Sequence, residues 1–105
     1  MPQLAGLPRY VQNLDTYRVI GENIKMLRSE VPITQLEFAR YIGIGNESLS
    51  RIEAGKNRSE YALVKAIAEV FGTTSDVLAT RDSYRYLRES QEVLERVRLL
   101  FNVFV

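Results

Sequence analysis

The fold of this chain is decided by residues 34–55, which read TQLEFARYIGIGNESLSRIEAG. Apolar residues recur in this stretch at the spacing of an α-helix, which repeats about every 3.6 residues. The pattern predicts two short helices, with buried faces formed by Phe38, Ala39 and Ile42 in the first and by Leu49 and Ile52 in the second. The glycine-containing segment Gly43-Ile44-Gly45 lies between them and predicts a tight turn.

Start and stop signals agree with this division into two helices. Thr34 and Glu37 have the spacing of a capping box, in which each side chain accepts a hydrogen bond from the other residue's backbone amide. Gly43 and Gly55 stand where a left-handed residue commonly ends a helix. Ala39 is small enough to let the second helix cross nearby. Together these features predict a helix-turn-helix unit.

This unit resembles the Cro/C1-type family of helix-turn-helix DNA-binding proteins, also called lambda-repressor-like or XRE. The residues that carry the resemblance are Gln35, the pair Phe38-Ala39, the run Ile42-Gly43-Ile44, Leu49 and the run Ile52-Glu53-Ala54-Gly55-Lys56. Flanking helices of the right length extend it over residues 17–79. The resemblance implies a helical DNA-binding domain.

Further helices are predicted on both sides of the unit. The first runs from Asp15 or Thr16 to about Glu30, and its apolar face is formed by Ile20, Ile24, Leu27 and Val31. A fourth helix is expected from about Glu60 to Phe71, and Thr74 caps a short fifth one. Residues 15–80 are therefore expected to form an all-α, five-helix domain of the lambda-repressor type.

The segments outside this domain have less certain roles. Residues 1–14 can be a loosely ordered tail or an arm that reaches DNA or a partner subunit. Residues 81–105 predict one further amphipathic helix, with an apolar stripe formed by Leu87, Leu94, Val97, Leu100, Phe101 and Phe104. This helix can fold back on its own domain or pack against a second subunit. We expect a dimerisation helix, because the stripe exceeds what such a domain needs for itself.

Composition excludes several kinds of chemistry. The 105 residues include 14 Lys and Arg, 13 Asp and Glu, no Cys and no His, for a net charge of +1. Disulfides, thiolate chemistry and the commonest general base are absent, and we expect no enzyme activity, no cofactor and no metal site. No apolar run approaches the ~18 residues that a membrane span needs. We therefore expect a cytoplasmic protein that does not contact a membrane.

The exposed face of the second helix of the unit predicts contacts to DNA bases. With Leu49 and Ile52 turned inward, the side chains on the opposite face are Glu47, Ser50, Arg51 and Ala54, and Asn46 projects from the N-terminal end of the helix. In a major groove, Arg51 can pair with guanine, Asn46 with adenine, and Glu47 can accept from cytosine. Glu47 and Arg51 can instead form an ordinary surface pair, since they are four residues apart on a helix.

Other residues are candidates for contacts to the DNA backbone. Gln35 begins the first helix of the unit, where its amide and the free backbone N–H groups can bind a phosphate, as the matching glutamine does in the family. The loop Lys56-Asn57-Arg58 resembles the backbone-contacting loop of the family. Arg40 and Tyr41 are weaker candidates. Such contacts set orientation and salt dependence rather than sequence preference.

The sequence thus predicts a DNA-binding transcriptional regulator, more readily a repressor than an activator. It would bind double-stranded DNA as a homodimer on a near-palindromic operator, with half-sites about one helical turn apart. Two alternatives remain: an antitoxin that neutralises a toxin and regulates its own operon, and a protein-interaction module that does not bind DNA. In each case the C-terminal helix can hold a protein partner.

Overall fold

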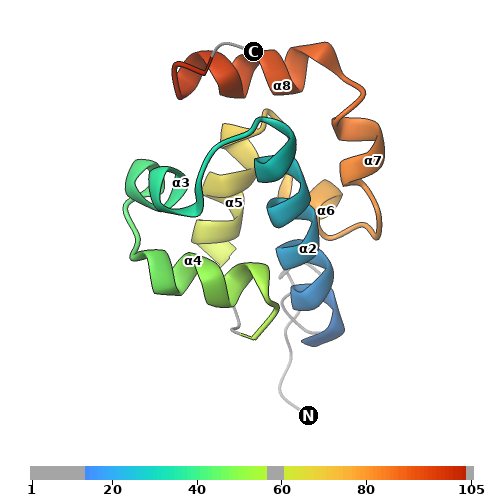
Figure 1. Ribbon diagram of the computed structural model, residues 1–105. Coiled ribbons are helices and arrows are strands. Elements are labelled where there is room, and N and C mark those ends of the chain that lie inside the picture. The colour runs from blue at the N-terminus through green and yellow to red at the C-terminus, as the bar shows by residue number, and fades with distance from the viewer. Residues whose placement is uncertain (1–13, 57–60, 104–105) are drawn as a thin grey trace.

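A computed structural model describes residues 14–56 and 61–103 of the chain. The described residues form helices and no strand, which confirms the all-α prediction (Figure 1). The helices are α2 (Leu14–Glu30), α3 (Gln35–Ile42), α4 (Asn46–Glu53), α5 (Tyr61–Val70), α6 (Ser75–Leu78), α7 (Tyr84–Leu87) and α8 (Gln91–Leu100). In Figure 1, α4 and the beginning of α2 lie toward one end of the molecule, and α8 lies across the other.

The predicted apolar faces meet in a shared hydrophobic core. All four residues of the predicted face of the first helix are buried, as are Phe38, Ala39 and Leu49 of the helix-turn-helix unit. From α5 and the residues after it, the core takes Val64, Ile67, Ala68, Phe71 and Leu78. The long α2 packs against α4, and Phe38 of α3 packs against Phe71 and Phe101, so the two eight-residue helices bury apolar sides that they could not bury by themselves.

The helix-turn-helix unit is bounded as its sequence signals predict. The Thr34 hydroxyl accepts from the backbone amide of Glu37, whose carboxylate in turn accepts from the Thr34 amide, so the capping box is present. Gly43 ends α3 with a φ of 80°, and Gly55 follows α4 with a φ of 71°. Residues with a Cβ atom adopt this left-handed conformation at a cost, so glycine suits both turns.

A glycine in α2 allows a close crossing with α4 that the sequence did not reveal. A Cβ atom placed on Gly21 would lie 2.1 Å from the carbonyl oxygen of Ile52 and 2.9 Å from that of Glu53. Both neighbours are backbone atoms, which no side-chain rotation can move aside. The position of α4 on the domain therefore depends on a residue without a side chain at position 21.

The chain beyond α6 is held to α2 by a buried amide. The Asn23 side chain donates to the carbonyl oxygens of Leu78 and Thr80, at 2.8 and 2.9 Å, and accepts from the Tyr84 amide at 3.2 Å. Asn23 thus supplies hydrogen-bond partners to three backbone groups where the chain passes from α6 to α7. This fixes the direction in which the C-terminal segment leaves the five-helix domain.

The prediction of one continuous C-terminal helix is wrong. The chain forms a single turn, α7, and then a separate helix, α8, whose N-cap is Ser90. The Ser90 hydroxyl accepts from the Val93 amide. Ser90 starts this new helix, because a serine side chain competes for backbone groups more readily than it supports a helix interior.

The proposed dimerisation stripe also needs correction. Leu87, Leu94 and Val97 are buried in the core of their own chain, and Phe101 stacks on Phe38 at a ring-centroid distance of 5.8 Å. These side chains are therefore not available to a second subunit in this structure. Of the six predicted residues, Leu100 stays exposed and Phe104 lies outside the described residues. The fold-back alternative describes this segment correctly.

Arginine contacts fasten α8 to the end of α2. The Arg98 side chain donates to the carbonyl oxygens of Val31 and Glu30, at 2.7 and 3.2 Å. The carbonyls at the end of a helix lack partners within it and carry partial negative charge, so a cation suits this position. Arg88 adds a 3.4 Å contact to the Glu30 carboxylate. The C-terminal segment is thus held to the domain by both apolar and polar contacts.

Candidate nucleic-acid interface

The outer face of α4 is open along its length. Leu49 and Ile52 are buried, whereas the four residues predicted to contact bases, Asn46, Glu47, Ser50 and Arg51, are exposed. Gly45 precedes the helix and makes no side-chain cap. No described segment covers this face, and α8 lies away from it (Figure 1). The structure thus brings the predicted base-contacting residues together on one accessible helix surface.

Glu47 and Arg51 do not form the surface pair considered from their spacing. Within the described part of the chain, no hydrogen bond or ion pair joins the two side chains. Arg51 therefore keeps all the donors of its guanidinium group for another partner. This matters because the paired recognition of a guanine needs two parallel N–H groups of one arginine.

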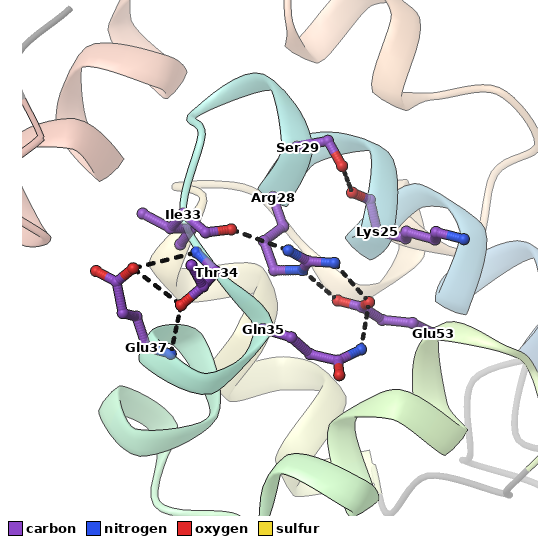
Figure 2. A network of polar contacts seen from close by, with 8 residues as sticks. All are labelled: Lys25, Arg28, Ser29, Ile33, Thr34, Gln35, Glu37 and Glu53. Atoms are coloured by element: carbon purple, nitrogen blue, oxygen red, sulfur yellow. Dashed lines mark hydrogen bonds and ion pairs between the residues drawn. The ribbon is translucent and has the colours of Figure 1, made fainter.

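Behind this face, a polar network joins three helices (Figure 2). The Glu53 carboxylate accepts from Arg28 Nε at 2.7 Å, from Arg28 Nη2 at 3.0 Å and from Gln35 Nε2 at 3.0 Å. Arg28 also donates to the Ile33 carbonyl at 2.9 Å. The network connects α2, α3 and α4 at the point where α4 ends.

The ion pair in this network is nearly removed from solvent. The side chain of Glu53 is 3% exposed and that of Arg28 is 14% exposed. Burying charges costs free energy, which a two-hydrogen-bond arginine–carboxylate contact with further partners can offset. The pair therefore acts mainly to fix one arrangement of the three helices, because each charge tolerates few other surroundings.

Sequence reasoning did not identify this pair, although a signal was present. Glu53 follows Leu49 by four residues and so lies on the buried side of α4 rather than on its DNA-facing side. A carboxylate at such a position requires a cationic partner from another element. Arg28, beside the buried Leu27, was the available candidate.

Gln35 is held in place by the same network. Its side chain is half-buried, and one of its two amide hydrogens is donated to Glu53. The NH₂ group carries two donors, so its second hydrogen is not used by Glu53. Gln35 is therefore held at the start of α3 by a hydrogen bond to the end of α4.

The remaining predicted backbone contacts are placed only in part. Lys56 is exposed in the turn after α4, while Asn57 and Arg58 lie outside the described residues. Arg40 and Tyr41 are exposed on α3. The Tyr41 ring lies 4.7 Å from that of Phe101, so this tyrosine contributes to the contact between α3 and the end of α8.

Other kinds of site receive no support from the described residues. Among them, no group of His, Cys, Asp and Glu side chains could hold a metal ion. No helix in the same part of the chain is both long enough and apolar enough to cross a bilayer. The open face of α4 with its supporting network is thus the feature around which a function can be argued.

In this chain, α3 is followed by a glycine turn and by α4, whose polar outer face is open. This arrangement defines the class of helix-turn-helix DNA-binding domains. Comparison with known families agrees, since the helix-turn-helix family matches residues 24–78. The chain belongs to the Cro/C1-type helix-turn-helix family.

The chain is also similar to antitoxin PezA of Streptococcus pneumoniae serotype 4, with 34% identity over 82 residues. The matched segment covers 78% of this chain and 52% of the relative, so the chain spans about half the length of that protein. No solved structure shows a significant match.

Proposed function

We propose that this chain is a sequence-specific regulator of transcription that places α4 in the major groove of DNA. The observation that carries this proposal is the open face of α4, where four polar side chains are exposed while the opposite face is buried. An α-helix fits the major groove, in which each base pair presents a distinct pattern of donors and acceptors.

Three of the four side chains on this face have a preferred base partner. Arg51, which has no partner in the described chain, would donate to the O6 and N7 atoms of a guanine. Asn46 at the start of α4 would pair with an adenine, and Glu47 would accept from the amino group of a cytosine. Ser50 can donate or accept. One such paired contact provides about 1–3 kcal/mol of discrimination against the wrong base.

Contacts to phosphates would orient the helix in the groove. Gln35 offers its second amide hydrogen from the start of α3, and Lys56 offers a charge after the end of α4. Asn57 and Arg58 follow Lys56 in the sequence and are proposed to act with it. These contacts would be insensitive to sequence and would weaken as salt increases.

We further propose that the chain acts as a homodimeric repressor on a near-palindromic operator. One eight-residue recognition helix reaches few base pairs, and a chain with a net charge of +1 gains little general attraction to DNA. Two subunits reading half-sites about one helical turn apart would supply the missing affinity. Since Leu87, Leu94 and Val97 are buried, the subunits would meet through side chains that are exposed on α8, such as Leu99 and Leu100.

The proposal is tested by selecting bound sequences from a pool of random duplexes at two salt concentrations. Recovery of a two-fold-symmetric site would support the homodimeric regulator and define its operator. Enrichment of a single half-site would support DNA binding and contradict the dimer. No enrichment at either salt would contradict the DNA-binding function and would favour a protein-interaction module.

The likeness to an antitoxin favours a second candidate function. The chain would then neutralise a toxin through a protein contact and use DNA binding to regulate its own operon. Co-expression with the product of an adjacent gene tests this idea. Rescue of growth, together with a complex of the two purified proteins, would support it; a harmless neighbour that forms no complex would oppose it.

A further inference from the structure

The turn that follows α4 packs directly on the beginning of α2. A Cβ atom placed on Gly55 would lie 2.7 Å from the Cα atom of Arg18 and 3.1 Å from its Cβ atom. Lys56 is the next residue and is exposed. Arg18, from a helix that sequence reasoning treated only as core, is therefore a neighbour of the segment that leaves the recognition helix.

Arg18 is part of a small charged cluster at this end of the molecule. Its Nε and Nη2 atoms donate to one carboxylate oxygen of Asp15, at 3.1 and 2.8 Å, and Arg81 donates to the other oxygen at 3.5 Å. All three side chains are more than half exposed. The hydrogen bond and the charge of Arg18 lower the pKa of the Asp15 carboxyl, which is thus ionised near neutral pH.

The charge of this cluster contrasts with that of the recognition face. Two arginines and the carboxylates of Asp15 and Glu22 balance, and Lys56, the residue after Gly55, leaves one positive charge at this end. On the outer face of α4, by comparison, the charges of Glu47 and Arg51 cancel. Attraction to the DNA backbone is therefore stronger beside the end of α4 than along the helix itself.

We propose that Arg18 binds a backbone phosphate at the edge of the major groove, next to the C-terminal end of α4; this rests on the DNA-binding function proposed above. The major groove is about 12 Å wide, so a helix within it has a phosphate backbone on either side. The flat guanidinium group can donate two parallel hydrogen bonds to a phosphate, which replaces the Asp15 carboxylate as its partner.

This exchange of partners predicts opposite effects for the two members of the pair. Arg18→Gln removes the contact and weakens binding. Asp15→Asn removes the competing carboxylate and strengthens binding. A purely structural pair would give no such opposition, because both changes would then break the same hydrogen bonds with similar consequences.

The test measures the affinity of the full chain for its selected duplex over a range of salt concentrations. Each phosphate contact contributes about 0.9 to the slope of log affinity against log salt. Arg18→Gln is expected to lower the slope by about 0.9, which corresponds to about an eightfold loss of affinity near 0.1 M salt. The matched control is Arg85→Gln, since Arg85 pairs with Asp82 at the same spacing and with similar exposure, on α7 away from α4.

A double variant separates a local contact from an effect of total charge. Asp15→Asn combined with Arg18→Gln leaves the net charge unchanged. The proposal predicts that the double variant keeps the reduced slope. A slope equal to that of the unmodified chain, or an equal loss for Arg85→Gln, would overturn it. If the unmodified chain binds DNA and Arg18→Gln has the same salt slope as the unmodified chain, only this inference fails. If the unmodified chain binds no DNA, the proposed function fails as well.

Discussion

Replacing Gly21 by alanine tests the close crossing of α2 and α4. The added Cβ atom would lie 2.1 Å from the Ile52 carbonyl oxygen, whereas close carbon–oxygen contacts in proteins are about 3.3 Å or longer. The helices would have to separate by more than about 1 Å, against backbone atoms at the end of α4. The Ile52 carbonyl already accepts from the Gly55 amide in the turn that ends this helix.

The expected loss of stability follows from two opposing effects. Overpacking of a dense interior costs about 1–3 kcal/mol and sometimes more, and this contact is at the severe end of that range. Alanine in place of glycine within a helix raises the free energy of unfolding by about 0.5–1 kcal/mol. We therefore expect a net loss of at least about 2 kcal/mol, which for a domain of this size lowers Tm by about 8–16 °C.

Thermal unfolding followed by circular dichroism measures this loss. Glu22→Ala, at the neighbouring exposed position of α2, serves as the control and should change the free energy of unfolding by no more than about 0.5 kcal/mol. A Gly21→Ala variant as stable as the unmodified chain, or more stable, would refute the crossing described here. Helix propensity would then dominate, and α4 would not be held against α2 at this point.

Three further substitutions test other parts of the fold. Glu53→Ala should lower the free energy of unfolding by about 3–5 kcal/mol in chemical denaturation, because it leaves the Arg28 charge buried without a partner. The double variant Glu53→Leu with Arg28→Met should lower it by less than Glu53→Ala alone. Phe101→Ala should lower the free energy of unfolding by about 2 kcal/mol in the same measurement, because Phe101 is half-buried against two aromatic rings. Glu95→Ala, on the exposed side of α8, should change it very little. Gly43→Ala should lower the free energy of unfolding by about 1 kcal/mol, because its backbone is left-handed while no atom lies within 4 Å of an added Cβ. A loss similar to that of Gly21→Ala would show that the added Cβ meets a steric contact at position 43 as well.

The parts of the fold that the sequence predicted are those governed by local rules. Helix periodicity placed Ile20, Ile24 and Leu27 on the buried face of α2, and capping chemistry placed the ends of α3. Each of these signals spans only a few residues. They could therefore be read without knowing how the helices pack together.

The predictions that were wrong concern residues whose pattern does not say which surface they pack against. The apolar residues after position 81 required burial, but periodicity does not say whether the cover is the same chain or another one. The contacts of Phe101 with α3 and of Arg98 with the end of α2 decide this, and both join residues far apart in the sequence. Gly21 is a similar case, because a glycine that permits a close crossing has no local signature.

The predicted interface shows the same division. The exposed residues of α4 followed from one helix and its buried face. The Arg28–Glu53 pair and the position of Arg18 beside Gly55 depend on where α2 lies against α4, so they became visible only in the assembled structure.

The central claim, that α4 reads bases, is tested most directly by comparing base preference in the unmodified chain and in Arg51→Ala. Affinity would be measured for the selected duplex and for duplexes changed at one base pair at a time. We expect Arg51→Ala to lose about 1–3 kcal/mol on the selected duplex and to stop discriminating at one position of each half-site, with preferences elsewhere retained. An equal loss on every duplex, with all preferences intact, would show that Arg51 contacts only the backbone and would contradict the claim.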